Sequence, residues 1–323
     1  MNMSEKKSRI QGTGKVYRFT IAQLMKSRTN RWTLLLLLIF ALASVPLLSL
    51  TGQESAGTGS AGSFTVRVET LTAYENPELL SSDAKFVLQY GYSILVLMLI
   101  TISSSYIIRS VVEEKASRLV EFLMVSVKPL ALILGKILAV MTYIFVMFAV
   151  TAAGLVCSYI ITARFMDVGA VRGLLEQAGL TSLEIGPQTV LITVVSLVLG
   201  YLTFSILAGL SGAACSNMEE VEGAATQVVI LGLIGYMVPV IFGNTVSGTG
   251  AVLLALCPVV SVFSAPVQFV TEAVGLPILL ASWGIQAAVI CILSVFMAKV
   301  YGGLIMYRGR KLQMKDLLKK GGF

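Results

Sequence analysis

The chain has 323 residues, of which 56% are hydrophobic and only 13% are charged, and its mean hydropathy is +0.86. Soluble globular domains carry about a quarter charged residues, so this composition excludes a soluble domain and indicates an all-α polytopic membrane protein. The net charge of +7 fits basic residues placed beside membrane spans better than it fits a nucleic-acid partner.

The N-terminal 31 residues are basic and precede the first apolar run of membrane-spanning length. We expect residues 1–31 to form a cytoplasmic or interfacial segment, with an interfacial helix from about Val16 to Arg31. Ala41-Leu42-Ala43 fits a signal-peptidase site, but the long leader favours a retained anchor. Apolar runs predict six spans, at Trp32–Leu50, Phe86–Ile108, Leu130–Ile161, Val190–Leu210, Thr226–Phe242 and Leu276–Met306.

Lysine and arginine predict the orientation of these spans, because basic loops stay in the cytoplasm. Eight basic residues precede the first span, four lie in residues 109–129, and six lie in the tail at 307–323, whereas residues 51–85 and 162–189 hold two each. Both termini and residues 109–129 are therefore expected inside. Residues 51–85 form an outer loop, Gly/Ser-rich at first and then briefly strand-like at Ser63–Leu71.

The segment Ala251–Val270 is also long enough to span, but it contains Pro258 and Pro266. A seventh crossing would place the basic tail outside. We therefore expect residues 251–273 to form a re-entrant or interfacial hairpin on the outer face, within a single transmembrane domain over residues 1–323.

Residues 112–129 read VEEKASRLVEFLMVSVKP and hold six charges. At 100° per residue, Val112 and Leu119 share one face and Glu114 and Arg118 share the opposite one. This predicts an amphipathic helix flat on the cytoplasmic surface, with Glu114 and Arg118 paired at i,i+4. Two roles are open for this helix: a binding surface for a soluble partner, or a solvated connector between two spans. A second cytoplasmic loop, SNMEEVEG at 216–223, is acidic and favours a basic partner surface.

The residue types also limit the chemistry of the chain. Histidine is absent, which excludes Ser-His and Cys-His catalysis and HExxH zinc sites, and the four cysteines form no CxxC pair. The spans hold no Asp or Glu, which argues against a proton antiporter. Their only charges, Lys136 and Lys299, are expected to reach water at the cytoplasmic end. Gly12-Thr13-Gly14-Lys15 is not a P-loop, since Arg9 and Val16 break the pattern. We expect no cofactor and no metal in this chain.

The segment around residues 112–138 matches two known motifs, and only the longer match indicates a function. Residues 113–118 match the EExxxR motif of CAAX-type glutamyl proteases, but those enzymes also need histidines, which this chain lacks. The run VEEKASRLVEFLMVSVKPLALILGKIL resembles the segment after the second span in ABC transporter permeases of the type-2 export superfamily, notably the NatB-like branch. Its matching positions are Glu113, Glu114, Lys115, Arg118, Glu121, Leu123, Pro129, Gly135 and Lys136.

The SNMEE of 216–220 resembles the second cytoplasmic loop of that family, although the outer loop at 51–85 is shorter than in NatB-like members. The resemblance implies an exporter subunit in the cell membrane whose cytoplasmic helix docks on a separate subunit that binds ATP and Mg²⁺, with a second permease copy or paralogue completing the pathway. The residues it assigns to ATPase coupling are Glu113, Glu114, Arg118, Glu121, Gly135, Lys136, Asn217, Glu219 and Glu220.

The substrate is left open by the sequence. The candidates are sodium, a hydrophobic drug or peptide, and a lipid. The alternatives to an ABC permease are a stand-alone carrier or channel, and a membrane enzyme or scaffold. Hydroxyl groups within the spans are candidate pathway residues, although such groups also join helices to one another. They are Tyr92, Thr101, Ser103, Ser104 and Tyr236.

Overall fold

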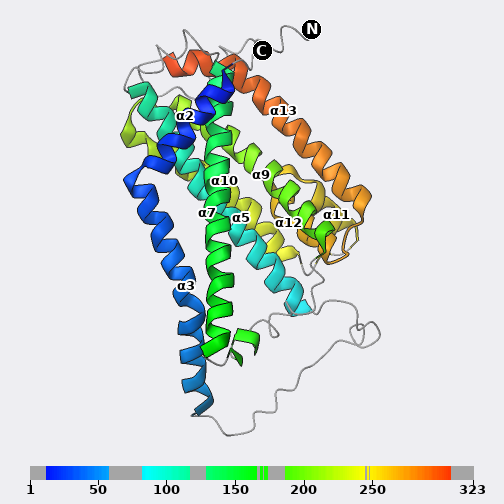
Figure 1. The fold of residues 1–323 in the computed structure, drawn as a ribbon. Coiled ribbons are helices and arrows are strands. Elements are labelled where there is room, and N and C mark those ends of the chain that lie inside the picture. Colours follow the sequence, from blue (N-terminus) through cyan, green and yellow to red (C-terminus); the bar gives the residue numbers. More distant parts are fainter. Residues whose placement is uncertain are drawn as a thin grey trace. The chain divides into compact units, whose positions relative to one another are not determined.

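The structure is a computed structural model that describes residues 12–57, 82–116, 129–165, 168, 169, 171–173, 186–243, 246 and 248–306. Every regular element in these ranges is helical (Figure 1), which confirms the predicted all-α class. The elements are α2 (Thr13–Lys26), α3 (Arg28–Gly57), α5 (Ser82–Ala116), α7 (Pro129–Phe165), α9 (Pro187–Ala214), the 3₁₀ helix η2 (Met218–Glu220), α10 (Val221–Phe242), α11 (Thr249–Leu256), α12 (Pro258–Val270) and α13 (Leu276–Met306).

Six of the described helices are long and apolar enough to cross a bilayer, as the sequence predicts. An apolar run forms a helix because hydrocarbon offers the backbone no other hydrogen-bond partner. The second span runs to Lys115 and the fifth begins at Met218, so both extend into charged sequence that a hydropathy pattern leaves out. The spans cover Asn30–Ser49, Ala84–Lys115, Ala131–Phe165, Pro187–Ala214, Met218–Phe242 and Leu276–Met297.

Some predicted features lie outside the described residues. They are the N-terminal residues 1–11, the strand-like Ser63–Leu71 of the outer loop, the centre of the predicted coupling helix at 117–128, and the basic tail at 307–323. Residues 112–116, expected to begin that flat helix, instead form the last turns of α5.

The chain divides into two compact units, and each is described by itself. Unit 2 contains α3 and the C-terminal part of α7. Ser158 donates a hydrogen bond to the Leu42 carbonyl over 2.7 Å, and a Cβ on Gly154 would lie 3.1 Å from that of Ala41, so the two helices are in close contact. Unit 1 comprises Met1–Leu24, Gln89–Ile144 and Gly186–Phe323, and unit 2 comprises Met25–Leu88 and Phe145–Ile185.

In unit 1, α9 packs against α10, α12 and α13. Glycines permit this close approach, as small residues do in membrane bundles generally. A Cβ on Gly200 would overlap the Val262 side chain, and one on Gly235 would lie 2.8 Å from both the Phe263 ring and the Val259 carbonyl oxygen. The packed surfaces of α9 and α10 therefore bring α12 into the interior of unit 1.

The predicted hairpin at 251–273 is present as two short helices, α11 and α12, which break at Cys257 (Figure 1). Pro258 starts α12, where its missing N–H costs nothing. Ser264 donates to the Leu254 carbonyl over 3.0 Å and joins the two helices. With 8 and 13 residues, neither helix reaches the ~20 that a span requires. The run Val260–Gln268 is entirely buried in unit 1, and the re-entrant or interfacial placement of the hairpin stays a prediction. Its side of the membrane stays a prediction.

Candidate functional site

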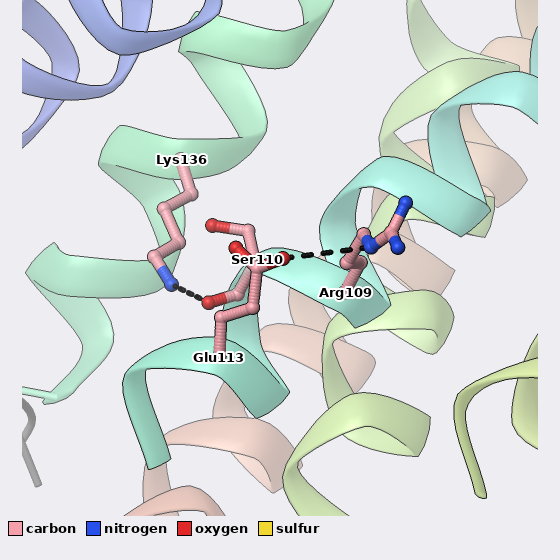
Figure 2. A network of polar contacts seen from close by, with 4 residues as sticks. All are labelled: Arg109, Ser110, Glu113 and Lys136. Atoms are coloured by element: carbon pink, nitrogen blue, oxygen red, sulfur yellow. Dashed lines mark hydrogen bonds and ion pairs between the residues drawn. The ribbon is translucent and has the colours of Figure 1, made fainter. Parts of the chain in front are cut away.

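Those predicted coupling residues that the structure describes lie at one end of unit 1, where α5 and α9 end and where α7 and η2 begin. Polar contacts join these four chain segments, and Figure 2 shows part of the network. We call this set of residues the charged end. It consists of Arg109, Ser110, Glu113, Glu114, Lys115, Lys136 and residues 213–220.

The centre of the charged end is an ion pair between α7 and α5. Lys136 is fully buried, and its Nζ lies 2.7 Å from Glu114 Oε2 and donates to the Ser110 carbonyl over 3.0 Å (Figure 2 shows the second contact). The expectation that Lys136 reaches water is therefore wrong. Burying an ammonium group is costly unless an opposite charge lies beside it, and the extension of α5 beyond Ile108 supplies that charge.

The two neighbouring glutamates of the motif face different surroundings. Glu113 lies 3.4 Å from Arg109 one turn earlier on α5, and both side chains are at least half exposed (Figure 2). Glu114 is turned inward to Lys136 and is 14% exposed. Arg118, its predicted partner, and Glu121 lie outside the described residues, so their roles stay predictions.

Lys115 was not among the predicted coupling residues, yet it joins the end of α5 to the end of α9. Its side chain is 3% exposed and donates to the carbonyls of Ala213 and Cys215, over 3.0 and 2.8 Å. The last carbonyls of a helix have no intrahelical partner, and a cation there also meets the negative end of the helix dipole. In the sequence, the match of Lys115 to the family motif was the signal that could have identified it as a functional residue. No spacing rule relates position 115 to position 213.

Gly135 and Lys136, the glycine–lysine pair of the motif, have separate structural roles. A Cβ on Gly135 would lie 2.8 Å from the Cβ of Val16 and 2.9 Å from the Thr13 carbonyl oxygen, both on α2. The absence of a side chain thus lets α2 rest directly on α7. Tyr17 adds a hydrogen bond to Thr142 over 3.2 Å.

The acidic loop at 216–223 is a helix start. Asn217 accepts a hydrogen bond from the Glu220 N–H over 3.2 Å, and the Glu220 carboxylate accepts one from the Ser216 N–H over 2.9 Å. This reciprocal arrangement resembles a capping box, and the helix dipole favours acidic residues in a first turn. Local structure therefore accounts for part of the acidity, while Glu219 remains exposed.

Among the predicted pathway residues, Tyr92 has a structural explanation. Its hydroxyl donates to the Val262 carbonyl over 3.2 Å. Val262 lies four residues before Pro266, which has no N–H to offer that carbonyl. Gln89 donates to the next carbonyl, of Phe263, over 2.9 Å. The Tyr92 hydroxyl therefore replaces the hydrogen bond that the proline removes from α12, and Gln89 adds one to the neighbouring carbonyl.

The other pathway candidates lie at different places in unit 1. Thr101 donates to a carbonyl of its own helix over 2.8 Å, and Ser103 lies 3.4 Å from Ser205 on α9. Ser104 is buried and has no hydrogen-bond partner among the described residues. The Tyr236 ring lies 6.4 Å from that of Tyr90. The contacts do not bring these residues together in one place.

Within the described ranges, no three His, Cys, Asp or Glu side chains gather as metal ligands would. The charged end instead holds ion pairs, helix caps and exposed charges, an arrangement suited to binding or mechanical coupling. Residues 41–299 match the model of the family described as ABC-2 family transporter protein.

The chain belongs to the ABC-2 transporter family. This ABC-2 protein is a multi-pass membrane component of a transporter. It is 25% identical over 208 residues to an uncharacterized protein, YhaP, of Bacillus subtilis (strain 168), with 63% of this chain and 48% of YhaP covered. The chain thus spans about half the length of this curated relative. No solved structure matches the chain.

Proposed function

We propose that this ABC-2 protein is the permease subunit of an ATP-driven exporter and that its charged end docks on a separate ATP-binding subunit. Two permeases, identical or paralogous, would line one pathway, and ATP and Mg²⁺ would be bound by the partner. The protein would lie in the cell membrane with both termini in the cytoplasm. Membership of the family and the linkage of two cytoplasmic loops at one end of unit 1 support this proposal.

The observation that carries the proposal is the pair of contacts made by consecutive residues of α5. Glu114 holds the start of α7 through Lys136, and Lys115 holds the end of α9. A force applied to either loop would therefore reach three spans as a rigid-body movement. On the exposed side of the same turns, Arg109 and Glu113 offer both signs of charge to a partner, which favours specific docking.

The test is ATP hydrolysis by the reconstituted complex. The permease is co-purified with the ATP-binding protein that we expect to be encoded beside it, and hydrolysis is measured in liposomes. Charge reversal at the exposed positions, Glu113→Lys and Glu219→Lys, should lower the permease-stimulated rate about tenfold or more. Glu272→Lys is the matched control, because Glu272 is also exposed but lies in the turn between α12 and α13. Equal rates for all three variants would refute the docking role.

A stand-alone carrier or channel is the second candidate, and the same liposomes separate the two. Transport by the purified chain with no ATP-binding subunit would favour the carrier. Transport that requires both the partner and ATP would favour the permease. The same preparation also tests whether the chain belongs to the NatB-like branch of the superfamily. The measurement is which substrate the reconstituted complex transports.

A further inference from the structure

A line of buried polar side chains follows the contact between α12 and α13. Gln286 on α13 donates to Ser261 on α12 over 2.8 Å, so these faces of the two helices meet. Gln268 lies two turns after Ser261, on the same face of α12, and Ser282 lies one turn before Gln286, on the same face of α13. We call these four residues the polar seam. It extends from the Ser261–Gln286 contact toward the turn at 271–275.

The polar seam is buried and incompletely satisfied. Gln268 is 3% exposed and Ser282 is 1% exposed. Neither the oxygen nor the nitrogen of the Gln268 amide has a hydrogen-bond partner within the part of the chain that the structure describes, and the same holds for the Ser282 hydroxyl and the Gln286 oxygen. A buried polar group without a hydrogen-bond partner lowers the stability of the fold by about 1–3 kcal/mol. Packing alone therefore does not explain why these groups are buried here.

A buried amide elsewhere in unit 1 shows the usual outcome. Gln89 is 4% exposed, and its nitrogen donates to Ser93 over 2.6 Å and to the Phe263 carbonyl over 2.9 Å. The Gln89 side chain thus stabilises α12 as an internal hydrogen-bond donor. Gln268 is buried to the same extent, near the C-terminal end of that helix, but its amide has no hydrogen-bond partner among the described residues.

The chemistry of the unmet groups defines the ligand. Gln268 Nε2 requires an acceptor, the oxygens of Gln268 and Gln286 require donors, and the Ser282 hydroxyl serves as either. A cation would leave the Gln268 N–H groups unmet, and an anion would face two carbonyl oxygens. Ala265 on α12, Leu279 on α13 and Val274 in the turn between them belong to one buried apolar cluster, and such surroundings disfavour an unpaired charge.

We propose that the polar seam binds a neutral group with both a donor and an acceptor, as a peptide or carboxamide group has, on an otherwise apolar substrate. The inference rests on the proposed transport function and names its substrate class. A substrate of this kind can bury apolar parts against the helices and exchange hydrogen bonds with the seam.

The test uses the full-length permease alone, in detergent, with N-acetyl-Leu-Leu-Leu-amide as the probe. Trp283 adjoins Ser282 in the sequence and donates to Ser196 over 2.9 Å, so its fluorescence reports on this region once Trp32→Phe removes the other tryptophan. We expect a saturable change with the probe and no change when sodium replaces choline. Gln268→Leu and Ser282→Ala should each weaken binding about tenfold, which is one lost hydrogen bond, and the exposed Gln188→Leu should not.

Thermal stability separates a binding role from a structural one. Replacing an unmet amide by a similar apolar side chain removes a penalty, so Gln268→Leu should leave the Tm unchanged or raise it by about 2 °C or more. Gln89→Leu should lower the Tm. The proposal is overturned if Gln268→Leu lowers the Tm as Gln89→Leu does, if the probe gives no saturable change, or if sodium alone gives one. Because no ATPase is present, failure of ATP coupling would not alter these results.

Discussion

Removing Glu114 should destabilise the protein strongly, whereas removing Glu113 should not. Glu114→Gln takes the counterion from Lys136, which is fully buried and 2.7 Å away. Breaking a buried pair by removing one partner costs about 3–5 kcal/mol. For a chain of this size, 1 kcal/mol corresponds to about 2–4 °C in Tm, so we expect a fall of roughly 6 °C or more.

Glu113→Gln is the matched control, since it is the same change one residue earlier. Its partner Arg109 is 67% exposed at a distance of 3.4 Å, and exposed pairs contribute about 0–1 kcal/mol. We therefore expect a Tm within about 4 °C of the wild-type value. The double variant of Glu114→Gln with Lys136→Met should lose less stability than the sum of the two single changes, because the two groups interact directly.

The assay is thermal unfolding of the purified protein in detergent, with all variants scanned at one heating rate because unfolding of such proteins is often irreversible. Equal Tm values for the Glu113 and Glu114 variants would show that Glu114 does not stabilise the buried Lys136. Additive losses in the double variant would show that Glu114 and Lys136 do not form a pair.

Two further predictions concern contacts between helices. Lys115→Met should increase the maleimide reactivity of Cys215 about tenfold, because the variant loses the two hydrogen bonds that Lys115 donates to the end of α9. An unchanged rate of modification would contradict the assigned contact. Tyr92→Phe should lower the Tm by about 2–4 °C in the wild-type protein. In a Pro266→Ala background the loss should be much smaller, because the new N–H donates to the Val262 carbonyl. The same loss in both backgrounds would show that Tyr92 does not compensate for the proline.

The sequence was sufficient to predict the number of spans and the short helix pair before the last one. Apolar runs fix the spans because the bilayer imposes a length on them, and Pro258 marks the break in the hairpin, whereas Pro266 lies inside α12. The span boundaries were less accurate where charged residues continue a helix. Glu114 and Lys115 belong to α5 because helix formation there depends on backbone bonds and tertiary contacts rather than on apolar side chains.

The pairing within the charged end could not be predicted from the sequence. Periodicity relates Glu114 to Arg118 at i,i+4, but it contains no information on Lys136 of the next span. The contact of Lys115 with the end of α9 joins positions about a hundred residues apart. In contrast, the Asn217 and Glu220 cap follows a local pattern that is visible in SNMEE, although we interpreted that stretch as a charge signal and a family motif rather than as a cap.

Site-specific photo-crosslinking detects a contact between the charged end and an ATP-binding subunit. A photoreactive amino acid is placed at position 113, 219 or 272 of the full-length permease in the assembled complex. We predict that positions 113 and 219 capture the ATP-binding subunit and that position 272 does not. Capture at position 272 alone, or at none of the three positions in an active complex, would contradict the account.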